Sequence, residues 1–357
     1  MLRLLHTADW HLGRRFPGFE PHAAQALARA RLQTVERLLA LADRLAVDAV
    51  LCAGDVFDEA SPDASVTEPL AELLRRQTRP LVLLPGNHDP LGGAQSPWNP
   101  SHPFRRALPD AVHVVDRDGF ELELDGGVIV ASPCHSTAGA LPVSERLPSR
   151  AEGDDRVRVG LAHGSTFGPS VPFPVAPDAI DPLGLDYLAL GDHHGLEIRS
   201  GGTTIAYPGT PEPTRHGETR AGHVLLAMVE RGHAFCEPEP VHRWRWRDAR
   251  IERVSDLEAL ADEGLRDTVL RVRFDATFTP VEQARAEALL ARIGRATDAL
   301  TIEREGLRLD LRDADAPLDT LSPLLAAAGQ ALLEQTRAGD VEAERALRHL
   351  FRLTLDP

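Results

Sequence analysis

The sequence predicts an α/β protein with a mixed sheet, and two observations carry this prediction. Over the first two hundred residues, short apolar runs alternate with helical or irregular stretches, a rhythm typical of α/β folds. Five of these apolar runs end in turns crowded with Asp, His, Asn and Gly. Because the carboxyl ends of strands in such a sheet meet at one edge, we expect the polar turns to converge there.

The elements of this first region follow in order along the chain. The apolar runs predicted as strands are residues 2–5, 49–53, 81–84, 157–161 and 187–190. Between the first two, residues 21–45 carry leucines at helical spacing and predict a helix. Residues 112–132 alternate apolar and polar around a Gly-Gly turn, which predicts an antiparallel hairpin beside the core. Residues 203–230 look similar and predict a second hairpin, with strands at 203–207 and 223–229 around a loop.

A second region begins near Arg243 and has a different pattern. The predicted elements are a strand at 244–254, a helix at 255–263 with Ser255 as N-cap, a strand at 268–274, a helix at 280–294 and a strand at 299–309. After Pro317 and Asp319, residues 326–337 and 341–351 predict a helical tail. We therefore expect a domain over residues 1–240, a small α+β module over 243–312 and a helical segment over 317–357.

Composition narrows the class of protein. The 357 residues contain no apolar stretch near the roughly 18 needed to cross a bilayer, and the amino terminus has no signal-peptide pattern. Three widely spaced cysteines suit a reducing compartment. We therefore predict a cytoplasmic protein without a membrane partner. The formal charge of −15 means that any contact with nucleic acid is local or assisted by a partner.

The five polar turns contain the groups that bind borderline divalent metals. They carry carboxylates, imidazoles and an amide, which suit Mn, Fe or Zn, whereas a structural zinc site would be expected to use thiolates. The predicted metal ligands are Asp9, His11, Asp55, Asn87, His163, Asp192 and His194. Each turn alone is a weak signal, because Asp and His often serve local hydrogen bonding in turns. Five turns in this order, each after an apolar run, make the metal interpretation much stronger.

The arrangement of these groups indicates the chemistry. One carboxylate between two ions, with imidazoles on either side, can hold a metal pair, and Asp55 is the natural bridge. Such a pair generates hydroxide from bound water at neutral pH and clamps phosphoryl oxygens. The sequence therefore predicts hydrolysis of a phosphate ester.

The order of the turns, DxH, GD, GNHD, H and GxxH, resembles that of the calcineurin-like metallophosphoesterase superfamily over about residues 1–230. The resemblance implies an α/β/β/α sandwich with two divalent metal ions. One ion would be held by Asp9, His11, Asp55 and His194, and the other by Asp55, Asn87, His163 and Asp192. His88 would protonate the leaving group or stabilise the transition state, and Asp58 or Asp89 would orient it.

The last turn departs from the family pattern. The family has GHxH where this chain has GDHH, so that Asp192 stands where a histidine ligand is expected. A carboxylate at this position adds negative charge and favours a harder ion such as Mn²⁺. The alternative ligand is His193, although an extended segment would point its side chain away from that of His194. Asp192 is the preferred assignment.

The spellings HTADWHLG, AGDVFD, PGNHDP and YPGTPEP most resemble the SbcD-type DNA repair nucleases. This resemblance implies Mn²⁺-dependent exonuclease or endonuclease activity, a capping module, a homodimer, and a carboxyl-terminal segment that docks on an SMC-like ABC ATPase. After the last turn, Arg215 and His216 could reach a substrate phosphate.

Two other functions stay open. A small-molecule phosphodiesterase or phosphatase of the same superfamily would suit the acidic charge. A non-catalytic scaffold that binds an ATPase would suit the unusual Asp192, although every other ligand position is filled.

Overall fold

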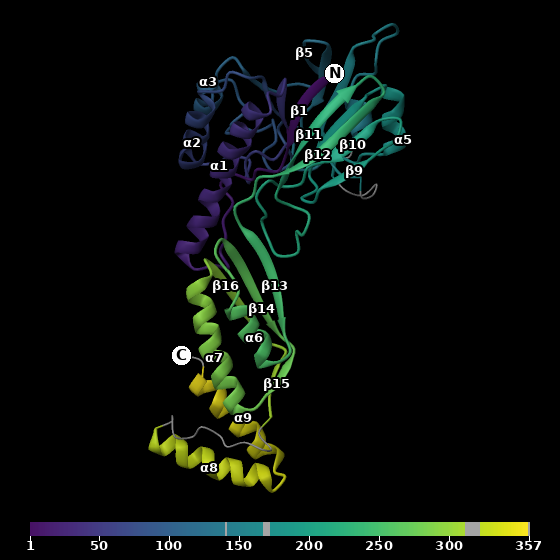
Figure 1. The fold of residues 1–357 in the computed structure, drawn as a ribbon. Helices are drawn as coiled ribbons and strands as arrows, with labels where there is room; N and C mark the ends of the chain where they lie inside the picture. Colours follow the sequence, from purple (N-terminus) through teal and green to yellow (C-terminus); the bar gives the residue numbers. More distant parts are fainter. Residues whose placement is uncertain (140, 167–171, 311–321, 356–357) are drawn as a thin grey trace. The chain divides into compact units, whose positions relative to one another are not determined.

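The computed structural model describes residues 1–139, 141–166, 172–310 and 322–355. It divides into two compact units, Met1–Trp246 and Arg247–Pro357, which we describe separately (Figure 1). The boundary falls close to the predicted start of the second region. The predicted linker between the α+β module and the helical segment lies outside the described residues, so the predicted division of the second unit stays a prediction. No helix in the described part of the chain is long and apolar enough to cross a membrane.

The first sheet has six strands in the order β12-β11-β1-β2-β3-β4. Along the chain these are β1 (Leu2–Thr7), β2 (Ala49–Cys52), β3 (Leu81–Leu83), β4 (Val112–Val114), β11 (His223–Glu230) and β12 (His233–Pro240). Strands β1 to β4 run parallel, whereas β11 pairs antiparallel with both β1 and β12. The predicted mixed sheet is therefore confirmed.

The second sheet also has six strands, in the order β5-β6-β7-β8-β10-β9. Its members are β5 (Phe120–Leu124), β6 (Gly127–Ser132), β7 (Val157–His163), β8 (Tyr187–Gly191), β9 (Glu197–Arg199) and β10 (Thr204–Tyr207). Strands β6, β7, β8 and β10 are parallel, and β5 and β9 pair antiparallel at the two edges.

The two sheets pack face to face, and helices cover their outer faces (Figure 1). The buried apolar cluster between them joins Leu4 of β1 and Leu51 of β2 with Val159 of β7. The helices of this unit are α1 (Pro21–Arg44), α2 (Ala64–Leu74), α3 (Pro103–Ala107), α4 (Val143–Arg146) and α5 (Pro177–Ile180), followed by the 3-10 helix Asp181–Leu183. Helices α1 and α2 bury apolar residues against the first sheet, and α4 and α5 against the second. This is the predicted α/β/β/α sandwich.

Two predicted hairpins differ in the structure. Of residues 112–132, only β5 and β6 form the antiparallel hairpin, while β4 belongs to the first sheet, because its three residues extend the parallel ladder from β3. Strands β10 and β11 likewise lie in different sheets. Two strands of this unit, among the residues that the structure describes, were not predicted. Strand β12 was missed because two of its eight residues are prolines and several are charged, and β9 has only three residues.

The second unit contains two small sheets with helices beside them. Its strands are β13 (Arg245–Ile251), β14 (Thr268–Phe274), β15 (Ala276–Phe278), β16 (Ala299–Glu303) and β17 (Leu307–Leu309), and its helices are α6 (Val254–Ala261), α7 (Pro280–Ala296), α8 (Pro323–Arg337) and α9 (Val341–Leu355). The predicted strand 299–309 is broken into β16 and β17, which pair in different sheets. Ser255 is not an N-cap, since α6 begins one residue earlier and Arg253 holds that position.

Candidate metal centre

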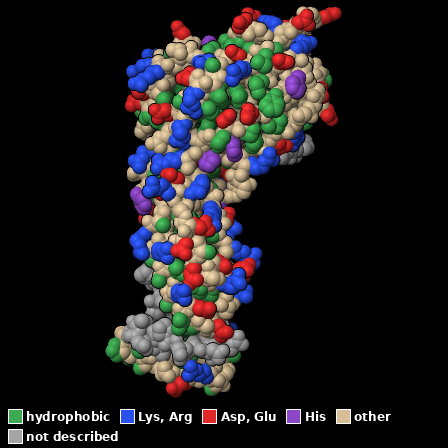
Figure 2. All heavy atoms as spheres, in the orientation of Figure 1, with side chains coloured by type: hydrophobic (Ala, Val, Ile, Leu, Met, Phe, Trp, Pro, Cys, Tyr) green, Lys and Arg blue, Asp and Glu red, His purple; other side chains and the backbone are tan. Residues whose placement is uncertain are grey.

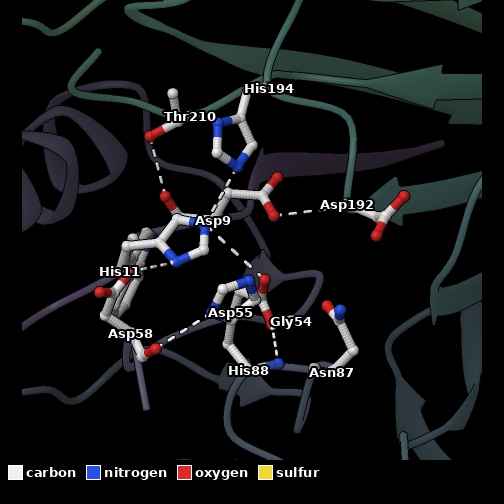
Figure 3. A network of polar contacts seen from close by, with 12 residues as sticks. Asp9, His11, Gly54, Asp55, Asp58, Asn87, His88, Asp192, His194 and Thr210 are labelled. Atoms are coloured by element: carbon white, nitrogen blue, oxygen red, sulfur yellow. Dashed lines mark hydrogen bonds and ion pairs between the residues drawn. The ribbon is translucent and has the colours of Figure 1, made fainter. Parts of the chain in front are cut away.

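The predicted ligands come together at the carboxyl ends of strands from both sheets (Figure 3). Asp9, Asp55 and Asn87 follow β1, β2 and β3 of the first sheet, with His11 in the same turn as Asp9. His163 is the last residue of β7, and Asp192 and His194 follow β8 of the second sheet. Because the parallel strands of the two stacked sheets end at one edge, turns remote in sequence form a single polar cluster.

Several of these ligands have unusual backbone conformations. The φ angles of Asp9, His11, Asp55 and Asp192 are 53°, 45°, 53° and 96°. Non-glycine residues seldom adopt this left-handed region, and each such position costs on the order of 1–3 kcal/mol. Hydrogen bonds between the turns hold them: the Asp9 amide donates to the Gly54 carbonyl at 3.0 Å, and the His11 amide to the Asp55 carbonyl at 2.9 Å. The ligand turns therefore support one another.

A buried arginine from α1 secures the first turn. The Arg31 guanidinium donates to the main-chain carbonyls of Trp10 at 2.6 Å, His11 at 3.1 Å and Asp9 at 3.2 Å. It also donates to the carbonyl of Glu212 at 2.8 Å, in the loop that follows β10. Burial lowers the pKa of Arg31 to about 10, which leaves the side chain charged at neutral pH. Arg31 thus fixes the backbone that aims Asp9 and His11.

The first group of ligands consists of Asp9, His11 and His194. The Nδ1 of His194 lies 2.8 Å from the Glu218 carboxylate, and the Nδ1 of His11 lies 3.1 Å from that of Asp58. With those nitrogens protonated, each Nε2 is an acceptor, yet the two Nε2 atoms lie only 3.0 Å apart. Asp9 Oδ2 is buried without a hydrogen-bond partner among the described residues. These facing lone pairs fit a bound cation.

The second group consists of Asn87 and His163, with Asp55 between the two groups. His163 Nδ1 donates to the Ala53 carbonyl at 2.8 Å, so that its Nε2 faces the Asn87 Oδ1 at 2.8 Å and the Asp55 Oδ1 at 3.5 Å. The other oxygen of Asp55 lies 3.7 Å from His11 Nε2. With His163 neutral, acceptors again face acceptors, and Asp55 has the position expected of a bridging carboxylate.

Two glycines make room for this arrangement. A Cβ at Gly54, which has a φ of 98°, would lie 2.2 Å from His163 Nδ1. A Cβ at Gly86 would lie 2.1 Å from the Asp55 carboxylate. At both positions the main chain therefore passes so close to a ligand that only glycine fits.

The electrostatics show a surplus of negative charge. Burial lowers the pKa of His163, but the carboxylates of Asp55, Asp9 and Asp192 outweigh it and raise the value to about 9. Burial raises the pKa of Asp9 to about 6, against the opposing effect of two histidines. Burial also lowers the pKa of His11 to about 4, which leaves it neutral. A cluster of carboxylates that must attract protons to balance its charge is suited to cations.

His88 stands beside the two groups with its ring exposed. Its Nδ1 lies 3.0 Å from the main-chain carbonyl of Asp58, and its ring meets that of His11 edge to face at 4.9 Å between centroids. The Asp58 carboxylate instead contacts His11 and receives a hydrogen bond from Arg14 at 3.0 Å. Asp89 is buried and accepts the amides of Phe57 and Gly86, so its carboxylate holds two loops together.

Asp192 and His193 face different surroundings. Asp192 Oδ1 lies 3.8 Å from His163 Nε2, and the Asp192 amide donates to Asp9 at 3.1 Å. His193 packs edge to face on Tyr207, and its Nε2 lies 4.0 Å from Glu197. The geometry favours Asp192 as the ligand, and the assignment stays a prediction.

Three residues that support the site were not predicted: Glu218, Arg31 and Arg14. Each acts on a ligand or its turn from a distant part of the chain, as Glu218 does on His194 and Arg14 on Asp58. A weak signal existed for Glu218, because a metal-binding histidine usually donates its second nitrogen to a carboxylate. Nothing in the residue pattern distinguished it from other glutamates.

The fold and the paired ligand groups are those expected of the calcineurin-like phosphoesterases. Residues 2–196 match the calcineurin-like phosphoesterase family, more than half of the chain, and the chain belongs to this family. The family uses a dinuclear metal site, which agrees with the two groups of ligands found here.

Three relatives extend the comparison. A metallophosphoesterase of Bacillus subtilis, YhaO, is 29% identical over 265 residues, which cover 70% of this chain and 63% of that protein. The SbcD component of the Bacillus subtilis nuclease SbcCD is 39% identical over 92 residues, 25% of this chain and 22% of that protein. The DNA double-strand break repair protein Mre11 of Methanopyrus kandleri is 28% identical over 236 residues, 59% of this chain and 49% of that protein. The chain spans less than two thirds of each relative.

Proposed function

We propose that this protein hydrolyses phosphodiester bonds in DNA with two divalent metal ions, as an exonuclease or endonuclease of the SbcD type. The observation that carries the proposal is the pair of ligand groups joined at Asp55, with the exposed His88 beside them. Similarity to a nuclease component and to a DNA break repair protein supports DNA as the substrate class.

Each part of the site has a role in this proposal. Asp9, His11, Asp55 and His194 would hold one ion, and Asp55, Asn87, His163 and Asp192 the other. Two ions bound there would activate water for attack and balance the charge of the phosphoryl oxygens. The Nδ1 of His88 hydrogen-bonds to the Asp58 carbonyl, and its Nε2 is therefore available to donate a proton to the leaving-group oxygen. Asp58 thus orients His88 through its main chain and His11 through its carboxylate.

The carboxylate of Asp192 bears on the choice of metal. A second site built from an amide, an imidazole and two carboxylates has more oxygen ligands than nitrogen ligands, and oxygen ligands favour harder ions. We therefore propose Mn²⁺ as the working metal.

A partner is part of the proposal because the chain is acidic. On the face drawn in Figure 2, acidic and basic side chains are interspersed. A DNA substrate then needs basic surface from elsewhere, which an SMC-like ABC ATPase would supply. Helices α8 and α9 expose Leu324 at 80%, Val341 at 61% and Leu325 at 38%, and exposed apolar side chains of this size suit a protein contact. We propose that residues 317–357 dock on that ATPase.

The test is Mn²⁺-dependent digestion of single-stranded and double-stranded DNA by the pure protein. Replacing His88 by alanine removes the proton donor, so we expect kcat to fall by about 10²–10⁴-fold. His22→Ala is the matched control, since His22 is exposed on α1 and belongs to neither ligand group. DNA cleavage at an equal rate by wild type and His88→Ala would contradict the proposed role of His88.

The acidic charge favours one other substrate class, a small nucleotide. If the wild-type protein cleaves cyclic or linear nucleotides with Mn²⁺ but leaves both forms of DNA intact, that alternative replaces the nuclease. If the wild-type protein binds metal normally but cleaves neither DNA nor nucleotides, a non-catalytic scaffold is indicated instead.

A further inference from the structure

A hollow lies beside the first ligand group on the surface of the first unit. It has a volume of about 360 Å³, and its wall includes Asp192 and His194 together with His193. The opposite side is formed by the loop after β10, through Arg215 and Arg220. Asp192 and His194, which point at the metal positions, therefore also border this second space.

The cationic side chains of the hollow are accessible. The Arg215 side chain is 74% exposed and lies 3.3 Å from the Glu218 carboxylate. Arg220 is exposed as well, and it forms no ion pair with any residue in the described ranges. Two guanidinium groups at the rim of one hollow form a site for an oxyanion, because the planar fork of arginine matches two oxygens of a phosphate.

The acidic groups of the hollow are already engaged. The Glu218 side chain is only 6% exposed and accepts hydrogen bonds from the Thr214 amide and hydroxyl, each at 2.7 Å, besides its contact with His194. Asp192 faces His163 on the metal side. Arg220 therefore keeps a charge that no carboxylate of the described residues balances, while Arg215 shares its charge with Glu218.

The loop that carries the arginines is held against the strand end that carries the ligands. The Leu196 amide donates to the Arg220 carbonyl at 2.9 Å, and the Thr210 amide donates to the His194 carbonyl at 3.1 Å. A Cβ on Gly195 would lie 2.9 Å from His193 Nε2, so a larger residue here would require the His193 ring, which borders the hollow, to shift. The main chain of Arg220 is thus fixed close to the strand end that carries His194, and Arg215 contacts Glu218, which contacts His194.

We propose that this hollow binds a second phosphate group of the substrate, adjacent along the strand to the phosphodiester that is cleaved. The inference rests on the proposed function and adds a specificity subsite to it. A substrate with one phosphate occupies only the metal groups. A nucleic acid strand also places a neighbouring phosphate between Arg215 and Arg220, which favours strands over small esters.

The first test compares dinucleotides that differ by one phosphate. TpT has a single phosphodiester, whereas pTpT and TpTp carry one more phosphate on the 5′ or the 3′ side. We expect wild type to have a kcat/KM about tenfold higher for one of the phosphorylated forms than for TpT, in line with a charge-assisted contact at a solvent-exposed site. In the double variant Arg215→Gln/Arg220→Gln, the ratio of kcat/KM for the phosphorylated form to that for TpT should fall toward one. The main cause should be a higher KM for the phosphorylated form.

Two further variants separate the subsite from folding and from overall charge. Arg220→Gln alone breaks no ion pair with the described residues. This variant should therefore have an unchanged melting temperature and a smaller preference for the phosphorylated dinucleotide over TpT. Arg76→Gln removes the same charge just after α2, before the amino end of β3, and should keep the wild-type ratio. Equal ratios for wild type and the double variant, or an equal loss in Arg76→Gln, would overturn the proposal.

A binding measurement gives a readout that does not depend on turnover. On the His88→Ala background, fluorescence anisotropy with a labelled oligothymidylate follows affinity against salt concentration. Losing one phosphate contact should reduce the slope of log K against log salt by about 0.7. An unchanged slope in the double variant would contradict the subsite. Failure of wild type to cleave or bind any DNA would refute the proposed nuclease itself, a distinct result.

Discussion

The two ligand groups of the metal centre are supported in different ways. In the first group, both imidazoles are backed by carboxylates, His11 by Asp58 and His194 by Glu218, and Asp9 is fully buried. In the second group, His163 is backed by a main-chain carbonyl. The Asp192 side chain beside it is 26% exposed. The first group is nitrogen-rich and backed by carboxylates, and the second is oxygen-rich. Each includes one side chain that is about a quarter exposed, His194 at 23% and Asp192 at 26%.

This difference suggests a division of labour between two ions. A carboxylate behind a histidine raises its basicity and fixes its tautomer, both of which strengthen metal binding. We therefore expect the first group to retain its ion and the second to exchange it more readily.

Asp55→Asn should remove the asymmetry by destroying both sites. Asp55 lies within 3.7 Å of histidines from both groups, so the loss of its charge weakens both ions at once. We expect phosphodiesterase activity with Mn²⁺ to be lost entirely and metal content to fall at both positions. Elemental analysis after dialysis measures the content. Retention of one full equivalent of metal would show that Asp55 serves a single site.

Glu218→Gln should weaken the first group alone. The amide cannot accept the proton of His194 Nδ1 with the strength of a carboxylate, and loss of such a partner typically lowers metal affinity about 10–100-fold. Mn²⁺ titration followed by electron paramagnetic resonance should show one weakened class of site and one unchanged class. Glu197→Gln is the control, because Glu197 contacts His193 and Arg199 and no predicted ligand. Equal weakening of both classes would refute the distinction.

The metal-free protein should lose stability as pH rises. His163 has a pKa of about 9, above its ordinary 6.5, so the stability from its protonated form is complete below pH 6.5 and is lost as pH rises through 9. Asp9, raised to about 6, acts in the same direction at lower pH. Thermal unfolding with chelator at pH 6.5, 7.5 and 9 measures this change, with a slope of up to one proton for His163. The Mn²⁺ form should lack this trend, because metal replaces the proton.

Asp192→His should change the metal selectivity of the second group more than its metal affinity. An added imidazole makes this site similar to the first, so we expect the preference for Zn²⁺ over Mn²⁺ to rise, by roughly tenfold. Competition titrations of the two ions measure the ratio. His193→Ala is the control, since His193 packs on Tyr207. A larger shift in His193→Ala than in Asp192→His would favour the alternative register.

The ligand turns were accessible from the sequence because each follows an apolar strand directly. Asp55 after residues 49–53 and His163 at the end of residues 157–161 are examples in which local order alone places the side chain at a sheet edge. The two-layer arrangement followed from resemblance, since alternation along residues 112–132 cannot tell which sheet a strand joins.

The contacts that support the ligand turns could not be predicted from the sequence, for a physical reason. Arg31 and Glu212 are 181 positions apart, and Arg14 and Asp58 are 44 apart, so their pairing is a property of the folded chain. Backbone strain at Asp9 and His11 is likewise invisible in composition, because the residues that compensate for it lie on α1 and in a distant loop.

The hydrogen bonds from Arg31 to three successive carbonyls have a consequence for how the protein binds its metal ions. The turn that carries Asp9 and His11 is held by hydrogen bonds that involve no metal ion, so its shape exists before any ion binds. Metal binding at this turn then costs little conformational entropy of the chain. Binding of an ion to Asp9 and His11 should therefore be fast and should require almost no rearrangement of the backbone.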